Sequence, residues 1–574
     1  MQTPVRFLAA AAVLMFPSLA GAAPYASGVT VAGDNVSFIL NEPADTVKVV
    51  FNEGASTLVI GTSPVPAGLK TFSKAGFATF RIEVEKNAPP GWKSGVVQQL
   101  SDDTNDLVKF ANGRGVSVNR EPGSGKWFGR IYVSTGAAGN AAPVTVPPTP
   151  VRATGEGIYV LNPDLTATDL GTSAIGGIFA SSGSANSPYR ITVGERGDLF
   201  IADWSDVNGS VYRTDGDVTG AVNVLAGPVG STFPVGSNSG KIHGSIAAVA
   251  TTGSIAANDL KLWTIDEDLQ DNPDNSTATQ LNSIWAWDQG GDPLPLTNSP
   301  VRVSTTGISF VAQTTDLARG KDGYLYKLQY RAAGNESGIT IINPNGNLPP
   351  LDPGVTPGTI SEASRAAYQG FRAAAEPNAA DPLLSAVACD ISDDNWLAVM
   401  RLPDNAIHLV KIVDGKFDFN NHILLYTAPT TTQGRDLSFD IAGNLYTLSS
   451  GQNLMRVYAR GGHTLAKTFS NGTFELTEPT PPVPAPPIDP LPAITGISRV
   501  DNDYLITFFS RLGRFDTHAI QRTIDPESIP WENSGSAGFP AAQFTITGTP
   551  PNFTARVIGA FGVEPRYFFR IRRN

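Results

Sequence analysis

The chain has 574 residues, of which 41% are hydrophobic and 16% are charged, and its formal net charge is −11. A chain of this length is expected to form several domains, and its apolar content is sufficient for packed cores, which argues against disorder throughout. Proteins that bind nucleic acid normally present a basic face to the phosphates, so the acidic balance argues against a nucleic-acid partner.

Residues 1–22 have the pattern of a secretory signal peptide. Arg6 supplies the positive start, residues 7–19 form an apolar stretch, and the AGA at 20–22 fits the small-residue cleavage rule. No later segment reaches the ~18 apolar residues of a membrane span, so we expect no transmembrane segment. Cys389 is the only cysteine, which excludes an intramolecular disulfide and suits a bacterial exported protein. We therefore expect a secreted, extracellular or cell-surface protein, with the periplasm as the alternative location.

Residues 23–88 are predicted to form a small β-sandwich. Apolar runs at 36–40, 46–51 and 78–84 are separated by turns rich in Gly, Asn and Pro. The segments VSFILNEPADTVKVVF and AGLKTFSKAGFATFRIEVEK resemble the Ig-like domain of flagellar-hook-capping proteins, which also stands at the head of some secreted bacterial propeller proteins. The resemblance implies an accessory β domain at the start of the mature chain.

One pattern of strands recurs between residues 94 and 476. It is clearest at 189–215, where three apolar runs are separated by polar turns. Antiparallel units that cannot bury their faces alone must stack, and radial stacking gives a β-propeller. We therefore predict an all-β fold with a six-bladed β-propeller, seven blades being the alternative. The central strand of the unit recurs at residues 130–133, 198–201, 260–263, 324–327, 395–398 and 444–447.

The segments ERGDLFIAD, GKDGYLYKL and DIAGNLYTL resemble the six-bladed family of NHL-repeat and gluconolactonase-like propellers. For a gluconolactonase-like enzyme, this resemblance implies a divalent cation inside the channel that polarises a lactone carbonyl and activates water. The sequence departs from that pattern, because the first blade has no obvious counterpart of the metal-site glutamate and three arginines oppose a cation at the same mouth. The acids available on or near inner strands are Asp316, Asp390, Asp436 and Glu195.

The residues that open the innermost strands are expected to face one mouth of the propeller channel. Convergent polar groups at such a mouth are candidates for ligand binding, and Arg190→Ala or Asp436→Ala is then expected to weaken binding without unfolding the protein. The alternative is a ring of ion pairs between blades that stabilises the packing. The candidate residues are Arg114, Arg190, Asp316, Arg435 and Asp436.

An acidic loop at 266–275 is a candidate cation site. Carboxylates at this density could chelate calcium, although the spacing is not that of an EF-hand. A solvated acidic loop is the alternative. The candidate ligands are Asp266, Asp268, Asp271 and Asp274.

Residues 477–492 are predicted to be a linker, and residues 493–574 a last β domain. Eight prolines between 479 and 492 favour an extended, semi-rigid spacer. The last unit contains apolar strand patterns up to 567–571, and it resembles the fibronectin-type-III-like tail domain of secreted bacterial repeat proteins.

The chain shows no recognisable catalytic constellation, because its five histidines are scattered and it has no G-x-S-x-G motif. We therefore expect a secreted, non-catalytic binding or scaffold protein whose ligand is a glycan or a surface protein. No cofactor is expected with certainty, and calcium is the candidate. One alternative is a metal-dependent propeller enzyme, either a lactonase-like hydrolase or an enzyme that acts on polysaccharides. Another is a structural component of the cell envelope.

Overall fold

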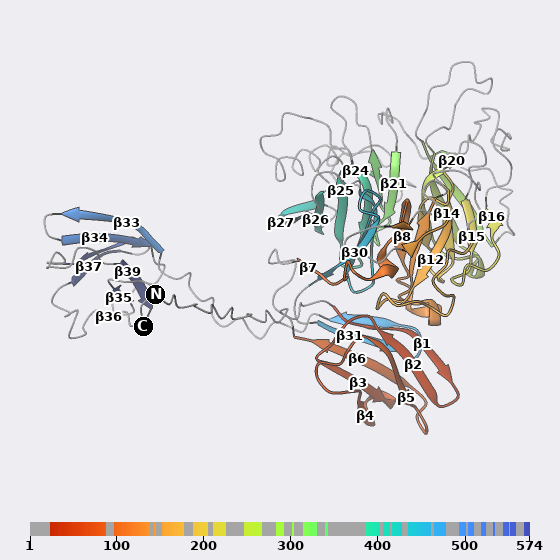
Figure 1. The fold of residues 1–574 in the computed structure, drawn as a ribbon, viewed down its shortest axis with the longest axis horizontal. Coiled ribbons are helices and arrows are strands. Elements are labelled where there is room, and N and C mark those ends of the chain that lie inside the picture. Colours follow the sequence, from red (N-terminus) through yellow and green to blue (C-terminus); the bar gives the residue numbers. More distant parts are fainter. Residues whose placement is uncertain are drawn as a thin grey trace, which may run out of the picture. The chain divides into compact units, whose positions relative to one another are not determined.

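The protein is almost entirely β-structure in antiparallel sheets, which confirms the predicted all-β fold (Figure 1). Its chain divides into two units, residues 1–479 and 480–574. The structure is a computed structural model, and it describes residues 23–87, 97–136, 143–144, 152–176, 187–204, 211–224, 246–266, 283–291, 301–302, 314–329, 339–342, 386–401, 406–413, 416–426, 434–460, 464–477, 493–500, 503–509, 518–523, 532–533, 544–549, 552–557 and 568–573.

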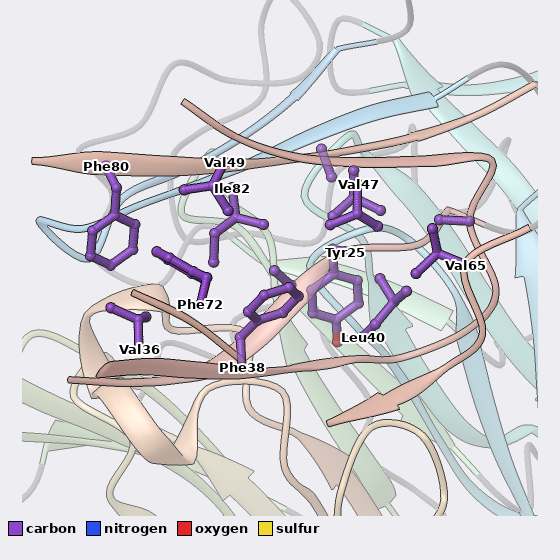
Figure 2. Close-up of a cluster of buried hydrophobic side chains, with 14 of the residues drawn as sticks. Tyr25, Val36, Phe38, Leu40, Val47, Val49, Val65, Phe72, Phe80 and Ile82 are labelled. Atoms are coloured by element: carbon purple, nitrogen blue, oxygen red, sulfur yellow. The ribbon is translucent and has the colours of Figure 1, made fainter. Parts of the chain in front are cut away.

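A β-sandwich forms one part of the first unit. Period-two alternation sends one set of side chains inward from each layer, and Figure 2 shows Phe38, Phe72 and Phe80 meeting between the layers. One sheet has the order β1 (Ala26–Ala32), β2 (Asn35–Leu40), β5 (Gly68–Ser73). The other has the order β32 (Phe474–Thr477), β31 (Thr464–Phe469), β6 (Phe80–Lys86), β3 (Thr46–Phe51), β4 (Ser56–Val59).

The sandwich is built from two distant parts of the chain. β31 pairs with β6 in the register Ala466↔Val84, and the backbone N–H of Phe80 donates to Ser470 Oγ at 3.2 Å. The sequence assigned residues 464–476 to the propeller, and this boundary is wrong for β31 and β32. An alternating strand pattern looks the same whichever sheet it joins, so the partner could not be read from it. The propeller is therefore inserted between β6 and β31.

Seven antiparallel sheets lie between residues 97 and 460 in the described ranges, and six of them are the blades of a propeller. The seventh is a two-stranded ribbon of β10 (Pro143–Val144) and β11 (Arg152–Ala153). The first strands of the six blades touch in chain order, and the last of them, β28, touches the first, β8, so the ring closes. The predicted central strands are confirmed. The blades are β8 (Gly113–Val118), β9 (Ile131–Thr135), β12 (Gly157–Leu161); β13 (Ile191–Val193), β14 (Leu199–Ala202), β15 (Val211–Thr214), β16 (Val222–Asn223); β17 (Ile246–Thr252), β18 (Leu260–Asp266), β19 (Ser283–Gly290), β20 (Val301–Arg302); β21 (Thr314–Arg319), β22 (Leu325–Gln329), β23 (Ile339–Ile342); β24 (Ala386–Ile391), β25 (Trp396–Arg401), β26 (Ala406–Val413), β27 (Lys416–Tyr426); and β28 (Gly434–Phe439), β29 (Leu445–Ser449), β30 (Leu454–Arg460), β7 (Val97–Gln99).

Backbone hydrogen bonds also close the ring, because the last blade takes its outer strand from the start of the repeat region. β7 pairs with β30 in the register Tyr458↔Gln99. Closure of this kind leaves the inserted ring without a free end between its first and last blades.

Hydrophobic clusters fill the spaces between adjacent blades. One joins Tyr326 and Leu328 of the fourth blade to Leu397 and Val399 of the fifth. A central blade strand is therefore buried on both faces, which explains why these strands read as nearly continuous apolar runs. The inner strands are held in place by these cores, and this rigidity positions the polar residues at the strand ends.

The sandwich packs on the propeller through its own core. Phe128, Ile441 and Ala442 of the propeller belong to the hydrophobic cluster of the sandwich. The backbone N–H of Gly28 donates to the carbonyl of Phe128 at 2.9 Å. The end of the channel toward which these residues lie is called the sandwich-facing end below, and the other is called the strand-start end.

The second unit contains two antiparallel sheets in its described residues, in agreement with a β domain after residue 493. Its resemblance to a fibronectin-type-III domain stays a prediction. Apart from Thr477, the predicted linker lies outside the described residues. None of the described helices is long and apolar enough to cross a membrane. The strands are β33 (Ala493–Val500), β34 (Asp503–Phe509), β38 (Asn552–Val557) and β37 (Phe544–Thr549) in one sheet, and β36 (Glu532–Asn533), β35 (His518–Thr523) and β39 (Phe568–Arg573) in the other.

Candidate functional site

A cavity of about 670 Å³ occupies the propeller channel. The inner strands of all six blades line it, and the turn between β31 and β32 contributes Gly472 and Thr473. Polar residues gather at both ends of the inner strands. Those at the strand-start end include three of the predicted residues, Arg190, Asp316 and Asp436.

The side chain of Arg190 links four blades at the strand-start end, because it contacts groups from three other blades. Its guanidinium forms an ion pair with Asp436 and approaches Asp316 Oδ2 at 3.5 Å. It also donates to the carbonyls of Thr315 (2.9 Å), Arg435 (3.0 Å) and Val387. The side chain is only 4% exposed. A buried guanidinium with this many acceptors is a structural tie, in line with the inter-blade ion-pair interpretation.

The two carboxyl groups opposite Arg190 are also engaged by backbone donors. Asp316 Oδ2 accepts from the N–H of Cys389 at 2.7 Å, and Asp436 Oδ2 accepts from the N–H of Val116 at 2.8 Å. Burial raises the pKa of Asp436 to about 7 and raises the pKa of Asp316, and the charge of Arg190 opposes both shifts without cancelling them. The two carboxyl groups therefore ionise less readily than exposed aspartates do.

The two other predicted mouth residues flank this cluster. Arg435 Nε donates to Ser450 Oγ at 2.8 Å. Burial, together with the nearby charge of Arg435, lowers the pKa of Arg114 to about 10. The structure thus brings the five predicted residues to one region, where Arg190, Asp316 and Asp436 form a single ion cluster. Arg435 joins that cluster through its backbone carbonyl.

At the sandwich-facing end, Arg120 links the first blade to the fifth. Its guanidinium donates to the carbonyl of Ile391 at 2.6 Å and to Asp390 Oδ1 at 3.1 Å. Asp390 also accepts from the N–H of Phe439 at 2.8 Å, which extends the link to the sixth blade. Lys321 Nζ lies 2.8 Å from Asp393 Oδ2. These groups form the charged wall of the cavity.

Glu195 stands on the turn after β13 and is held by the third blade. Its Oε1 accepts from Thr252 Oγ1 at 3.0 Å and from the N–H of Gly253 at 2.8 Å. The carboxylate is therefore fixed in direction while its residue remains exposed. A fixed carboxylate at a cavity wall can accept a hydrogen bond or face a cation.

Glu121 differs from these groups because its carboxyl has no hydrogen bond or ion pair with any residue that the structure describes. It precedes the 3-10 turn η4 (Pro122–Trp127), but its side chain does not cap that turn. Burial raises the pKa of Glu121 to about 7, and the charges of Asp393 and Glu195 add to the rise while Arg120 opposes it. A half-buried acid that is poised near neutral pH can donate or accept a proton.

Arg319, at the end of β21, is the second charged side chain of the cavity wall that has no ion pair among the described residues. Its Nε is buried without a hydrogen-bond partner among the described residues, and its guanidinium carbon lies 5.8 Å from the ring centroid of Trp263. Burial lowers the pKa of Arg319, and the carboxylates of Glu195 and Asp322 oppose that shift. None of the ion pairs found within 4.0 Å among the described residues includes Arg319.

Sequence reasoning missed Glu121 and Arg319. It searched for polar residues that open the inner strands, whereas Glu121 follows β8 and Arg319 is the last residue of β21. The available signal was the run of charged residues at or directly after the end of an inner strand, in NRE at 119–121 and RGK at 319–321. Whether these two side chains are paired depends on residues from other blades, and this cannot be read from a sequence pattern.

The acids proposed for a gluconolactonase-like cation site are divided between the two ends. Asp316 and Asp436 join Arg190, whereas Asp390 joins Arg120. In the described part of the chain, no group of three or more His, Cys, Asp or Glu is placed to hold a metal ion. Of the calcium candidates, Asp266 ends β18, and Asp268, Asp271 and Asp274 lie outside the described residues.

No protein-family model and no curated protein matches this sequence. Similar solved structures include the calcium-binding protein regucalcin from Agrobacterium tumefaciens, with 9% identity, coverage of 62% of this chain and 91% of that chain, and a TM-score of 0.31. A protein assigned as a gluconolactonase has 11% identity, coverage of 65% and 97%, and a TM-score of 0.33. A Trichoderma reesei carbohydrate-active enzyme of family AA12, in its calcium structure, has 10% identity, coverage of 65% and 97%, and a TM-score of 0.33. Similarity at this level carries no argument about function, and the fold assignment rests on the sheet topology.

Proposed function

We propose that the protein binds a small polar ligand in the channel cavity, at the sandwich-facing end. The observation that carries this proposal is that Glu121 and Arg319 line one cavity while neither side chain has an ionic or hydrogen-bond partner in the described residues. Polar groups removed from water are normally paired, and the Nε of Arg319 is such a group. Its position in one cavity with the half-buried carboxyl of Glu121 favours a ligand that pairs with both side chains.

The strand-start end is the less suitable binding region. The guanidinium of Arg190 already meets two carboxyls and three carbonyls, and the carboxyls also accept from backbone N–H groups. A ligand there would have to displace existing interactions without offering better ones. The same cavity therefore has one end that is internally satisfied and one end that offers groups to a ligand.

The proposal places this binding outside the cytoplasm. It rests on the signal-peptide pattern at residues 1–22, which lie outside the described residues, and on the single cysteine of the chain. Export with cleavage after Ala22 predicts a mature chain that begins at Ala23, which N-terminal sequencing of the exported protein would check.

A second candidate function is enzymatic, and one observation favours it. Burial raises the pKa of Glu121 to about 7, the range in which a carboxyl serves as a general acid or base. Glu195 and Asp393 lie close enough to influence that pKa, so a second carboxylate is available near the same ligand. Hydrolysis of a polar substrate is the reaction class that this pair supports. Turnover that Glu121→Gln abolishes while binding survives would favour the enzyme over the binding protein.

The experiment is to block the cavity and measure binding. Thr251 lines the cavity from β17 and Thr473 from the β31–β32 turn, and a tryptophan at either position would fill part of the space. The control is Thr71→Trp, on an exposed position of β5 in the sandwich. A panel of sugars, sugar acids, amino acids and short peptides is screened by ligand-observed NMR, and hits are measured by calorimetry.

We expect Thr251→Trp and Thr473→Trp to weaken binding of a hit by at least about tenfold, which is ~1.4 kcal/mol, while Thr71→Trp leaves it unchanged. Thr473 is exposed, so its variant tests the site even if the more buried position does not tolerate tryptophan. Equal affinity in all three variants would show that the cavity is not the binding site.

A further inference from the structure

Arg319 differs from Arg120 and Arg190, the two other arginines that line the cavity in the described structure. Each of those two meets a carboxylate directly, Asp390 for Arg120 at 3.1 Å and Asp436 for Arg190. Arg319 lines the same cavity without such a partner among the described residues, and its Nε is shielded from water. The Nε–H of this guanidinium lacks the acceptor that it would have in water, and an anionic ligand would supply one.

The groups near Arg319 limit which anion can bind. Glu195 and Asp322 act electrostatically on Arg319, and Glu195 and Asp393 act on Glu121. Electrostatic repulsion from these carboxylates would oppose the binding of a doubly charged phosphate more than that of a singly charged carboxylate. The planar fork of a guanidinium also matches the two oxygens of a carboxylate. The carboxylate is therefore the better match to Arg319.

The part of the cavity wall formed by Glu195 and Glu121 favours a positively charged group. Glu195 is held through one oxygen only, and the carboxyl of Glu121 has no partner in the described chain. Of the cations in the wall, Arg120 and Lys321 are already paired with Asp390 and Asp393. An ammonium group is a compact donor of three hydrogen bonds that such carboxylates accept well.

We propose that the ligand is a small zwitterion, an amino acid or a short peptide, whose carboxylate binds Arg319 and whose ammonium group lies against Glu195 and Glu121. This inference rests on the proposed binding function and names the ligand class for the same cavity. The volume of about 670 Å³ accommodates a molecule of this size.

The experiment uses the full-length protein, the twenty free amino acids and the dipeptide alanylalanine. The strongest binder is then compared with two derivatives, its C-terminal amide, which lacks the carboxylate, and its N-acetyl form, which lacks the ammonium group. Each is measured by calorimetry on the wild type, Arg319→Gln and Arg319→Lys. Inorganic phosphate is added as a competitor to distinguish a carboxylate site from a general anion site.

We expect the wild type to prefer the zwitterion over both derivatives by at least about tenfold. Arg319→Gln should lose the preference for the zwitterion over its amide and keep its affinity for the amide, and Arg319→Lys should restore part of the preference. Phosphate should not compete at equal concentration. The specific loss of one preference separates ligand contact from a structural defect, which would weaken all three compounds together.

Three results would overturn the ligand assignment. They are no binding of any amino acid or alanylalanine to the wild type, an Arg319→Gln variant that keeps the preference for the zwitterion, and competition by phosphate at lower concentration than the zwitterion. A different polar ligand that Thr473→Trp blocks would, in that case, leave the proposed cavity site standing. If, in addition, Thr473→Trp blocks the binding of no other polar ligand, the proposed cavity site is excluded as well.

Discussion

The two ends of the propeller channel contain the same kinds of residue and differ in how completely those residues are paired. At the strand-start end, Arg190 meets two carboxyl groups and three carbonyls contributed by three other blades. At the sandwich-facing end, Arg319 meets an aromatic ring and no carboxylate within ion-pair distance in the described structure. Arg190 directly precedes β13 and Arg319 ends β21, yet one joins blades and the other has no carboxylate partner among the described residues.

This difference shows that charge at a propeller mouth is not by itself evidence of a binding site. A buried ion cluster in which every charge is paired stabilises the fold, because breaking it leaves charges without partners. A polar group that lacks partners can contribute to ligand binding, because a ligand can supply those partners. Substitution of Arg190 should therefore lower stability, and substitution of Arg319 should lower ligand affinity.

The largest effect is expected from removing each arginine in turn. Arg190→Met leaves Asp316 and Asp436 buried without their guanidinium, so the free energy of unfolding should fall by about 3–5 kcal/mol. Arg319→Met removes a ring contact and none of the ion pairs of the described structure, so its cost should stay below about 1 kcal/mol. Chemical denaturation of the two variants and the wild type at pH 7 measures the difference.

The comparison fails if the two variants lose similar stability. A large loss for Arg319→Met would mean that this side chain, like Arg190, has a structural role, and it would weaken the case for a ligand there. A small loss for Arg190→Met would return the strand-start end to consideration as a binding region, as the sequence first indicated.

A smaller effect is expected from the packing of the strand-start end. A Cβ on Gly115 would lie 2.6 Å from the carbonyl oxygen of Tyr189 and 2.9 Å from the Cα of Arg190, both backbone atoms. Gly115→Ala should therefore push the first two blades apart and cost about 1–3 kcal/mol. Gly155→Ala is the matched control, because nothing lies within 4 Å of its Cβ position.

Thermal unfolding of the two glycine variants checks this point, and the control should change by no more than about 0.5 kcal/mol. If Gly115→Ala is as stable as the control, the strand-start end is looser than its contacts indicate. Ligand binding at the sandwich-facing end should be retained in both variants.

The smallest effect is a pH dependence of binding. Burial raises the pKa of Glu121 to about 7, with Asp393 and Glu195 adding to the rise and Arg120 and Lys321 opposing it. An ammonium group binds the ionised carboxyl better than the neutral acid, so affinity should rise as the pH increases from 6 to 8 through that pKa. With one titrating group the gain cannot exceed about tenfold per pH unit.

Calorimetric titration of the zwitterion at pH 6, 7 and 8 measures this dependence, and Glu121→Gln should flatten it because the amide cannot ionise. Affinity that falls over the same range, or an unchanged slope in Glu121→Gln, would show that Glu121 does not face the ammonium group.

Much of the fold was predictable because a propeller repeats its local rules. The central strands at 198–201, 324–327 and 444–447 are apolar on both faces and follow tight polar turns, and each became the second strand of a blade. The exception is β31, whose alternation is correct but whose partner is β6, almost 400 residues earlier. Hydrogen-bonded pairing over that separation depends on the whole ring being closed, which local patterns do not encode.

The candidate site was predictable only in part. The sequence identified charged residues at the channel, and it offered the ion-pair interpretation that fits Arg190, Asp316 and Asp436. It passed over Glu121 and Arg319, whose side chains are set apart by having no ion pair among the described residues. Whether a charged side chain is paired depends on residues from other blades, such as Asp390 for Arg120.

By itself the sequence determined the all-β class, the six repeated sheets and the acidic, cysteine-poor character of the chain, because strand alternation, turn residues and composition act locally. Only the tertiary structure decided that the sandwich is completed by strands from beyond the propeller. It also decided that the strand-start end is internally paired, while the sandwich-facing end leaves Glu121 and Arg319 without an ion pair among the described residues. The physical reason is that pairing of strands and of charges is a property of neighbours in space, and the ring brings together neighbours that are hundreds of residues apart.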